Sequence, residues 1–321
     1  MEQHTDFNKL QDLEKNIGKI IIGKDNEIRL LLTALLANGH ILLEDTPGTG
    51  KTMLAKALAA SISGIYKRVQ FTPDLLPSDV TGINIYNQKN QEFEFIAGPV
   101  FTNILLADEI NRATPRTQSC LLEAMAEGQV TTDGITRTLH KPFFMIATEN
   151  PIETAGTFPL PEAQLDRFSM RISLGFPTVE EELEIMNRYI LNNPMEHLAP
   201  VCTLSDIEAF QAEAAKVFIH EDIKKYIIQI IHATRTHEQV ALGINPRGTL
   251  SLMRCTQAYS YLSGRSYVIP EDIKYLAVPC LCHRLLSFTS SGSQSFAVSI
   301  IEQILDSIPV PTENFEKPNT L

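Results

Sequence analysis

Hydrophobic and polar positions follow different repeats in the two halves of the chain. In the first half, short apolar runs alternate with segments in which apolar residues recur every three or four positions, a pattern typical of βαβ units around a parallel sheet. The predicted strands are residues 40–43, 69–71, 104–107, 143–147 and 170–174, and helical periods cover 28–36 and 53–58. The first half is therefore predicted to be an α/β fold with a doubly wound parallel sheet.

Two segments interrupt this alternation with the pattern of β-hairpins. Asp133-Gly134 stands between β-branched residues, the strongest local signal for a hairpin. Residues 83–85 and 93–95 alternate apolar and polar positions on either side of a polar loop, which predicts a second hairpin. Because a compact parallel sheet needs neither, both hairpins are predicted to be insertions.

Helical periods dominate after Pro177. The predicted helices are residues 180–191, 205–217, 221–235, 249–262, 270–286 and 296–304. Acidic residues open two of them, where the helix dipole favours negative charge. The sequence thus predicts a core over residues 1–177, beginning with a helical segment, and an all-α domain over residues 178–321.

Composition narrows the class of protein. The 321 residues carry a formal net charge of -11, which disfavours a large surface for nucleic acid. No apolar run approaches the ~20 residues of a membrane span, and the first residues do not begin a signal peptide. The 5 cysteines are an odd number and are scattered, which suits reduced thiols. We expect a soluble cytoplasmic protein without a membrane span.

A phosphate-binding motif follows the first predicted strand and precedes a predicted helix. Glycines such as Gly48 and Gly50 let backbone N–H groups close around a phosphate, Lys51 reaches the β and γ phosphates, and the Thr52 hydroxyl binds Mg²⁺. The motif's first glycine is replaced by Asp45, whose carboxylate would weaken polyphosphate binding if it pointed inward. The predicted nucleotide-binding residues are Asp45, Thr46, Pro47, Gly48, Thr49, Gly50, Lys51, Thr52 and Met53.

Polar residues also follow two other predicted strands. The carboxyl ends of parallel strands border the crevice where such sheets bind ligands. There Asp108 is a candidate Mg²⁺ ligand, and Glu109 a candidate base for the water that attacks the γ-phosphorus. Asn150 is placed to bridge that water and the γ-phosphate. Two arginines, Arg167 and Arg247, are candidates to stabilise a phosphate under attack, either from the same or from a neighbouring subunit.

In this order, the motifs resemble the AAA+ ATPases and, within them, the MoxR family of chaperone-like ATPases. The similarity extends over about residues 20–286 and is strongest at 71–79, 107–113, 147–151 and 160–168. It implies that residues 45–52 are Walker A, Asp108 and Glu109 Walker B, and Asn150 sensor 1. It also implies that Arg167 is an arginine finger acting on a neighbouring subunit and that Arg247 is sensor 2 on a helical lid.

The same resemblance implies further partners. Family members are typically hexameric rings, and the adenine is expected against Ile22 and Gly23. The implied function is Mg²⁺-dependent ATP hydrolysis that remodels or activates partner proteins, including proteins with a von Willebrand factor A domain, for metal or cofactor insertion. A nucleotide-gated scaffold with weak hydrolysis, a chelatase ATPase subunit and a DNA-remodelling motor remain alternatives. The negative net charge weighs against the last.

Overall fold

Five parallel strands form the central sheet of the computed structural model, which describes residues 2–151, 156–191, 193–288, 294–312 and 315–316. Their order across the sheet is β2-β5-β8-β1-β9. The strands are β1 (Ile41–Glu44), β2 (Tyr66–Gln70), β5 (Ile104–Asp108), β8 (Phe144–Glu149) and β9 (Met170–Ile172). Each overlaps a predicted strand, so the predicted parallel sheet is confirmed.

The order of the strands reverses at β1. From β1 the chain crosses to the edge strand β2, returns through β5 and β8, and then passes to β9 on the other side of β1. Ligands of open α/β sheets bind outside the carboxyl ends of the strands at such a reversal. The loop after β1 is therefore in the position where the sheet offers a binding crevice.

Helices cover both faces of the sheet because its strands are apolar on both sides. Ile41 and Leu43 pack with α1 (Glu2–Gly18), α2 (Asp25–Leu36) and α3 (Lys51–Ser61). The intervening Leu42 faces the opposite cluster, which includes Leu121 of α5 (Pro115–Glu127). Alternation of side chains along a strand thus divides one apolar run between two cores. The short helices α4 (Pro77–Thr81), α6 (Glu162–Leu165) and η1 (Ile110–Arg112) complete this half.

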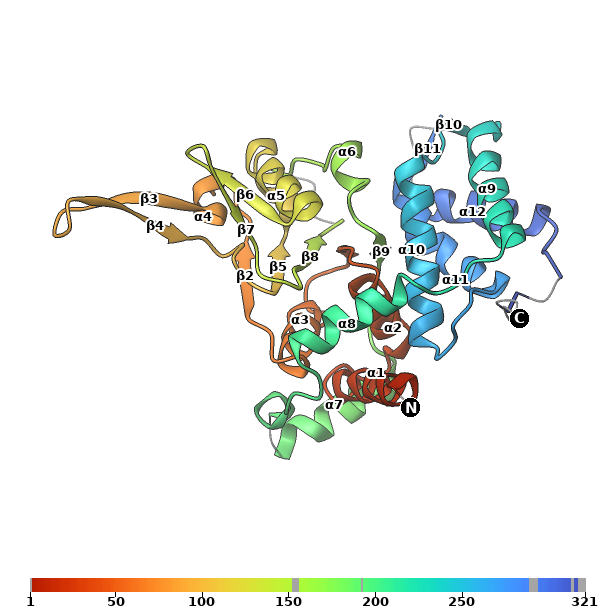
Figure 1. Cartoon of the computed structure of the whole chain (residues 1–321), viewed down its shortest axis with the longest axis horizontal. Coiled ribbons are helices and arrows are strands. Elements are labelled where there is room, and N and C mark those ends of the chain that lie inside the picture. The colour runs from red at the N-terminus through yellow and green to blue at the C-terminus, as the bar shows by residue number, and fades with distance from the viewer. Residues whose placement is uncertain (1, 152–155, 192, 289–293, 313–314, 317–321) are drawn as a thin grey trace.

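Both predicted hairpins are present. They are β3 (Gly82–Asn87) with β4 (Glu92–Ala97), and β6 (Gln129–Thr132) with β7 (Ile135–Thr138). The β3–β4 hairpin projects from one end of the molecule (Figure 1). The two hairpins touch each other, because the Arg137 guanidinium lies 3.7 Å from the centroid of the Phe95 ring and Asn84 donates a hydrogen bond to Asp133.

The second half is mainly helical, as predicted. Its helices are α7 (Val179–Leu191), η2 (Pro194–His197), α8 (Leu204–Ala214), α9 (Glu221–Thr236), α10 (Pro246–Leu262), α11 (Pro270–Leu281), η3 (Cys282–Arg284) and α12 (Gln294–Ser307). The predicted helix over 270–286 is too long, since α11 ends at Leu281 and the chain continues into η3. Two short strands, β10 (Val240–Leu242) and β11 (Leu286–Ser287), pair beside these helices.

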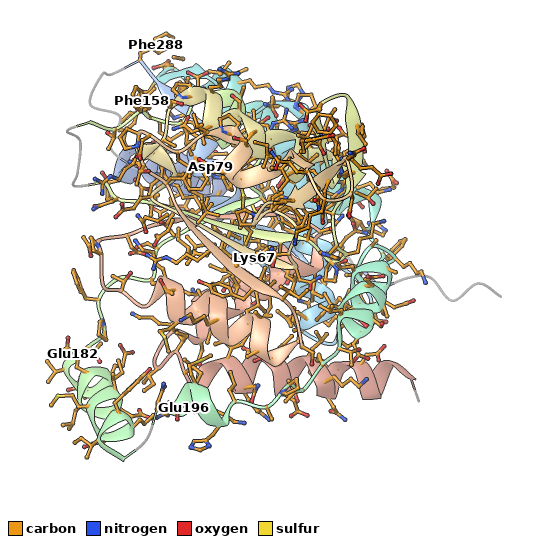
Figure 2. All side chains as sticks on the ribbon, turned by 90° about the vertical axis from the view of Figure 1, so that its left-hand side faces the viewer. Lys67, Asp79, Phe158, Glu182, Glu196 and Phe288 are labelled. Carbon is orange, nitrogen blue, oxygen red and sulfur yellow. The ribbon has the colours of Figure 1, made fainter. Side chains whose placement is uncertain are left out.

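The change from strands to helices falls between β9 and α7, a stretch that contains Pro177. A domain boundary at Pro177 itself stays a prediction. Helix α7 lies beside α1 rather than among α9 to α12 (Figure 1), and its Glu182 stands at the opposite end of the molecule from Phe158 and Phe288 (Figure 2). Within the described ranges, no helix combines the length and hydrophobicity that a membrane crossing requires.

His40 ties the sheet to α5 at the start of β1. Its Nδ1 accepts a hydrogen bond from the Met145 amide at 3.1 Å, and its Nε2 donates to the Met125 carbonyl at 3.0 Å. The neutral ring therefore uses both nitrogens. Burial lowers the pKa of His40 to about 4, although the hydrogen bond to Met125 opposes this shift.

We expect His40 to make the folded state less stable as the pH falls from 6.5 to about 4. The unfolded ring takes up a proton near its ordinary pKa of 6.5, whereas the folded ring does so only near 4. This difference corresponds to a loss of about 3 kcal/mol across that window. Urea unfolding at about pH 7.5 and about pH 5 should show about 2 kcal/mol of this loss, because pH 5 lies within the window.

The substitution His40→Gln keeps a donor and an acceptor but removes the titration, so its midpoint should fall less between the two pH values than that of the wild type. His140→Gln, at an exposed position, is the control and should fall as much as the wild type. Equal falls in all three proteins would contradict the assignment.

Candidate functional site

The phosphate-binding loop, residues 45–52, joins β1 to α3. Gly48 and Gly50 have left-handed φ values of 90° and 92°, which glycine adopts without strain. An added Cβ at either glycine would have no atom within 4 Å, so the loop borders open space. The first helical hydrogen bond of α3 runs from the Leu54 amide to the Gly50 carbonyl, which leaves the earlier amides available to an anion.

Lys51 supplies a positive charge at this loop. Its Nζ donates hydrogen bonds to the carbonyl oxygens of Asp45 at 2.7 Å and Thr46 at 3.3 Å. Burial lowers the pKa of Lys51, and the nearby carboxylates of Asp45, Asp108 and Glu109 act in the opposite direction. A half-buried ammonium held by carbonyl oxygens is suited to exchange these acceptors for phosphate oxygens.

The Asp45 carboxylate is engaged by the segment that follows β9. It accepts hydrogen bonds from Ser173 Oγ at 2.7 Å, the Leu174 amide at 2.7 Å and the Gly175 amide at 3.0 Å. The residue is 5% exposed. The departure from the glycine of the motif therefore gives the loop an attachment to the chain after β9.

Asp108, at the end of β5, is buried and shared by two neighbouring strands. One carboxylate oxygen accepts from Thr148 Oγ1 of β8 at 2.6 Å. The other accepts from Arg68 of β2, at 3.0 Å from Nε and 2.5 Å from Nη2. This carboxylate combines a cationic partner with a hydroxyl donor, and carboxylate oxygens are ligands that hard divalent cations prefer.

Glu109 has a left-handed backbone, with φ 56° and ψ 49°. For a residue other than glycine this conformation costs about 1 kcal/mol or more. Its amide donates to Thr148 Oγ1 at 2.8 Å. Its Oε2 accepts from Gln70 Nε2 at 2.7 Å and Arg112 Nη1 at 2.9 Å. Three hydrogen bonds, to β8, β2 and η1, thus hold this residue, and two of them set the direction of its carboxylate.

Asn150 follows β8 immediately and is buried, 5% exposed. The Thr148 hydroxyl, two residues earlier, bonds both Asp108 and the Glu109 amide. The sequence alone assigns no role to Thr148, Arg68 or Gln70. The signal for them is polar residues at the ends of predicted parallel strands, since the register places Gln70 of β2 opposite Asp108 of β5.

The two candidate arginines lie together at another place. Arg167 Nη1 donates to the Leu122 carbonyl of α5 at 3.1 Å, and its Nε is buried without a partner among the described residues. Arg247, in the first turn of α10, has its Nη1 3.8 Å from Asp166 Oδ2, and Arg284 Nη1 lies 2.7 Å from Asp166 Oδ1. Asp166, which directly precedes Arg167 in the chain, therefore lies close to two arginines of the second half.

A cavity of about 890 Å³ contains both Arg167 and Arg247 in its lining, together with Arg254 and Lys141. Residues 45–52, all of them described, are not part of this lining. The structure thus brings Arg167 and Arg247 together but places them on a different cavity from the phosphate-binding loop.

The predicted adenine contacts lie beside α7. Ile22 is buried, and Gly23 has a positive φ of 70°. A Cβ on Gly23 would lie 1.8 Å from Glu181 Oε1, so the Glu181 side chain occupies that place. Lys24 Nζ donates to the Phe176 carbonyl at 3.1 Å. The start of α7 therefore covers the segment assigned to the adenine.

A nucleotide and a divalent cation fit the groups at the carboxyl ends of β1, β5 and β8. Open space borders Gly48 and Gly50, and the Lys51 ammonium supplies a positive charge for the phosphates. Thr52 supplies a hydroxyl and Asp108 a buried carboxylate for the divalent cation. Oxygen ligands of this kind suit Mg²⁺.

Comparisons with known proteins agree with this geometry. The model of the ATPase family associated with various cellular activities matches residues 40–170, and that of the AAA lid domain matches residues 232–304. The chain is 49% identical over 300 residues to the uncharacterised protein YeaC of Bacillus subtilis, covering 93% of this chain and 94% of YeaC.

It is 38% identical over 308 residues to the protein named Chaperone MoxR1 of Mycobacterium tuberculosis, covering 93% of this chain and 81% of that protein. It is 29% identical over 335 residues to the protein MoxR of Paracoccus denitrificans, covering 94% and 96%. A crystal structure of a Cytophaga hutchinsonii protein, provisionally named an ATPase, superimposes with a TM-score of 0.88 at 38% identity and 97% coverage of both chains. The chain belongs to the MoxR family of AAA+ ATPases.

Proposed function

We propose that this protein binds ATP and Mg²⁺ at residues 45–52, hydrolyses the γ-phosphate, and uses that cycle in a cytoplasmic ring to remodel or activate partner proteins. The observation that carries the proposal is the shared Thr148 hydroxyl, which holds the Asp108 carboxylate and the Glu109 backbone beside the phosphate-binding loop. One side chain thereby holds in place both the candidate cation ligand, Asp108, and the candidate base, Glu109.

In the proposed reaction each side chain has a separate task. The α3 amides and Lys51 bind the phosphates, Thr52 and Asp108 hold the cation, and Asn150 orients the attacking water. Glu109 accepts a proton from that water as it attacks the γ-phosphorus. Mg²⁺, when bound, neutralises charge on the β and γ phosphates. Glu109 Oε2 is hydrogen-bonded to Gln70 and Arg112, so this oxygen would accept the proton only after exchanging one of these donors.

A ring is proposed because the arginines are separated from the phosphate-binding loop. Arg167 and Arg247 line a cavity to which residues 45–52 do not contribute, and Arg167 has a buried, unpartnered Nε among the described residues. A head-to-tail contact would bring this cavity of one subunit to the nucleotide of the next, and such contacts form a ring when the rotation between subunits closes. We propose a homohexamer, with Arg167 and Arg247 acting on the neighbour's γ-phosphate.

Protein clients suit the rest of the surface better than nucleic acid. Net charge is -11, and the β3–β4 hairpin exposes apolar side chains, among them Phe93 at 76% and Tyr86 at 52%. Exposed apolar groups on a projecting hairpin are suited to contact another protein. We propose clients that include von Willebrand factor A domain proteins and processes such as metal or cofactor insertion.

A nucleotide-gated scaffold with weak hydrolysis is the second candidate. It is favoured by the contacts of Gln70 and Arg112 to Glu109 and of Arg68 to Asp108, which hold both carboxylates away from other partners. Steady-state ATPase measurements with and without Mg²⁺ separate the two functions, because the scaffold would bind ATP with little turnover in either condition.

Replacing Glu109 by Gln should leave ATP binding intact while turnover falls about 10²- to 10⁴-fold, because the amide cannot accept the proton of the attacking water. Phosphate release and nucleotide titration measure the two effects. Glu92→Gln, at an exposed position on the β3–β4 hairpin, is the matched control and should behave as the wild type. Undiminished turnover by the Glu109→Gln protein would reject the base.

Arg167→Ala and Glu109→Gln subunits should each be inactive alone but recover activity when mixed. In a mixed ring, a wild-type Glu109 can face a wild-type Arg167 across an interface. Activity is measured over a series of mixing ratios, with Arg116→Ala, at an exposed position on α5, as the control that needs no rescue. Absence of recovery at every ratio would argue against action across the interface.

Thr148→Val preserves side-chain shape but removes the hydroxyl that joins Asp108 to the Glu109 amide. We expect kcat to fall about 10- to 100-fold with little change in ATP affinity, since the catalytic groups lose their alignment. Thr148→Ser retains the hydroxyl and should keep most of the activity. Equal losses in both variants, at equal melting temperatures, would show that the hydrogen bonds are not responsible.

A further inference from the structure

Asp45 makes contacts to three parts of the molecule at once. Its amide donates to the Glu149 carbonyl at the end of β8 at 3.3 Å, and its own carbonyl accepts from Lys51 Nζ at 2.7 Å. Its carboxylate accepts from the Ser173 hydroxyl and from two amides of the segment after β9. One buried residue of the phosphate-binding loop therefore connects the loop lysine with the chain that leaves the sheet.

The segment bound by Asp45 is the covalent connection from the core to α7 and the following helices. The connection contains Gly175, whose φ of +64° favours glycine, and a Cβ there would meet nothing within 4 Å. The Leu174 and Gly175 amides both donate to Asp45. The next fixed point is the Phe176 carbonyl, which accepts from Lys24 on the surface. The Asp45 carboxylate is thus the buried attachment of a connection in which Leu174 is buried and Gly175 borders open space.

The glycine of the ordinary motif could not make this attachment. Glycine has no side chain, so a loop with glycine at position 45 would have its main-chain contacts but would leave the amides of Leu174 and Gly175 without their carboxylate acceptor. Charge-assisted hydrogen bonds of this kind are about twice as strong as neutral ones. The replacement of glycine by Asp45 therefore adds a contact that phosphate binding alone does not require.

We propose that Asp45 is a positioning residue that couples the nucleotide state of the phosphate-binding loop to the segment that connects β9 with α7. The proposal rests on the proposed ATP binding at residues 45–52. When Lys51 binds the phosphates, it leaves the Asp45 carbonyl. Asp45 thus loses one contact while its carboxylate holds the connection at Ser173, Leu174 and Gly175. The contacts of Asp45 therefore differ between the two states of the loop. A difference of this kind is what coupling between two sites requires.

Hydrogen exchange of the full chain tests this coupling, because the Leu174 and Gly175 amides report the attachment directly. In the wild type, exchange of the peptide that contains both should change when ATP is added. In Asp45→Gly it should be faster by about tenfold without nucleotide and should no longer respond to ATP. The kcat of Asp45→Gly should fall, and a nucleotide titration of the same protein shows whether the loop still binds ATP.

Two further variants separate coupling from a general structural role. Ser173→Ala removes one of the three donors and should keep the response to ATP. Asp45→Asn has the same size but places an NH₂ group against an amide N–H of Leu174 or Gly175. Its hydrogen exchange at this peptide should therefore resemble that of Asp45→Gly. If Asp45→Gly fails to fold, the contrast between Asp45→Asn and Ser173→Ala decides the question.

The inference is overturned if Asp45→Gly retains the ATP-dependent change of exchange, or if the wild type binds ATP without any change at this peptide. It is also overturned if Asp45→Gly loses ATP binding at an unchanged melting temperature, since Asp45 would then serve the loop alone. Failure of the wild type to bind ATP would instead refute the proposed function. The faster exchange of Asp45→Gly without nucleotide would remain as the signature of the attachment.

Discussion

The reversal of strand order at β1 is the constraint on which the rest of the site depends. Because β1 lies between β8 and β9 while the chain continues first to β2, the carboxyl ends of β1, β5 and β8 come side by side. Each of these strands is buried, so its first polar residues appear only where it ends. The apolar pattern that builds the sheet therefore also determines where Lys51, Asp108 and Asn150 can meet.

Electrostatics within this edge follow from burial. Asp108 is 8% exposed, and its carboxylate is hydrogen-bonded by Arg68 and by the Thr148 hydroxyl. Glu109 is held in the same way by Gln70 and Arg112, at the cost of a left-handed backbone. Each carboxylate therefore has hydrogen-bond donors that it could exchange for a cation or a water molecule. Hydrogen bonds between strand ends thus prepare the groups that a phosphate and its cation would use.

The sequence predicted the five strands, both hairpins and the helical second half because each depends on local apolar periodicity or turn chemistry. It could not predict the partners of Asp45, since Ser173 and Leu174 are far away in sequence and meet it only when β9 pairs with β1. The roles of Thr148 and Arg68 depend in the same way on register between strands. The predicted helix over 270–286 is too long for another reason. Cys282 and Leu285 are buried, as the helical period requires, but they lie in η3 and directly after it and not in a longer α-helix.

The positions of the arginines and of Asp45 are two consequences of one chain path. The segment that leaves β9 passes the phosphate-binding loop, where Asp45 binds it, and then continues to α7, whose Glu181 covers Gly23. The later helices α10 and α11 return to the other side, where Asp166 pairs with Arg284 and lies near Arg247. The segment after β9 thus contacts the phosphate-binding loop, whereas Arg167 and Arg247 line a separate cavity. Arg167 precedes β9 and Arg247 follows it, so this cavity joins residues from both sides of the connection that Asp45 holds.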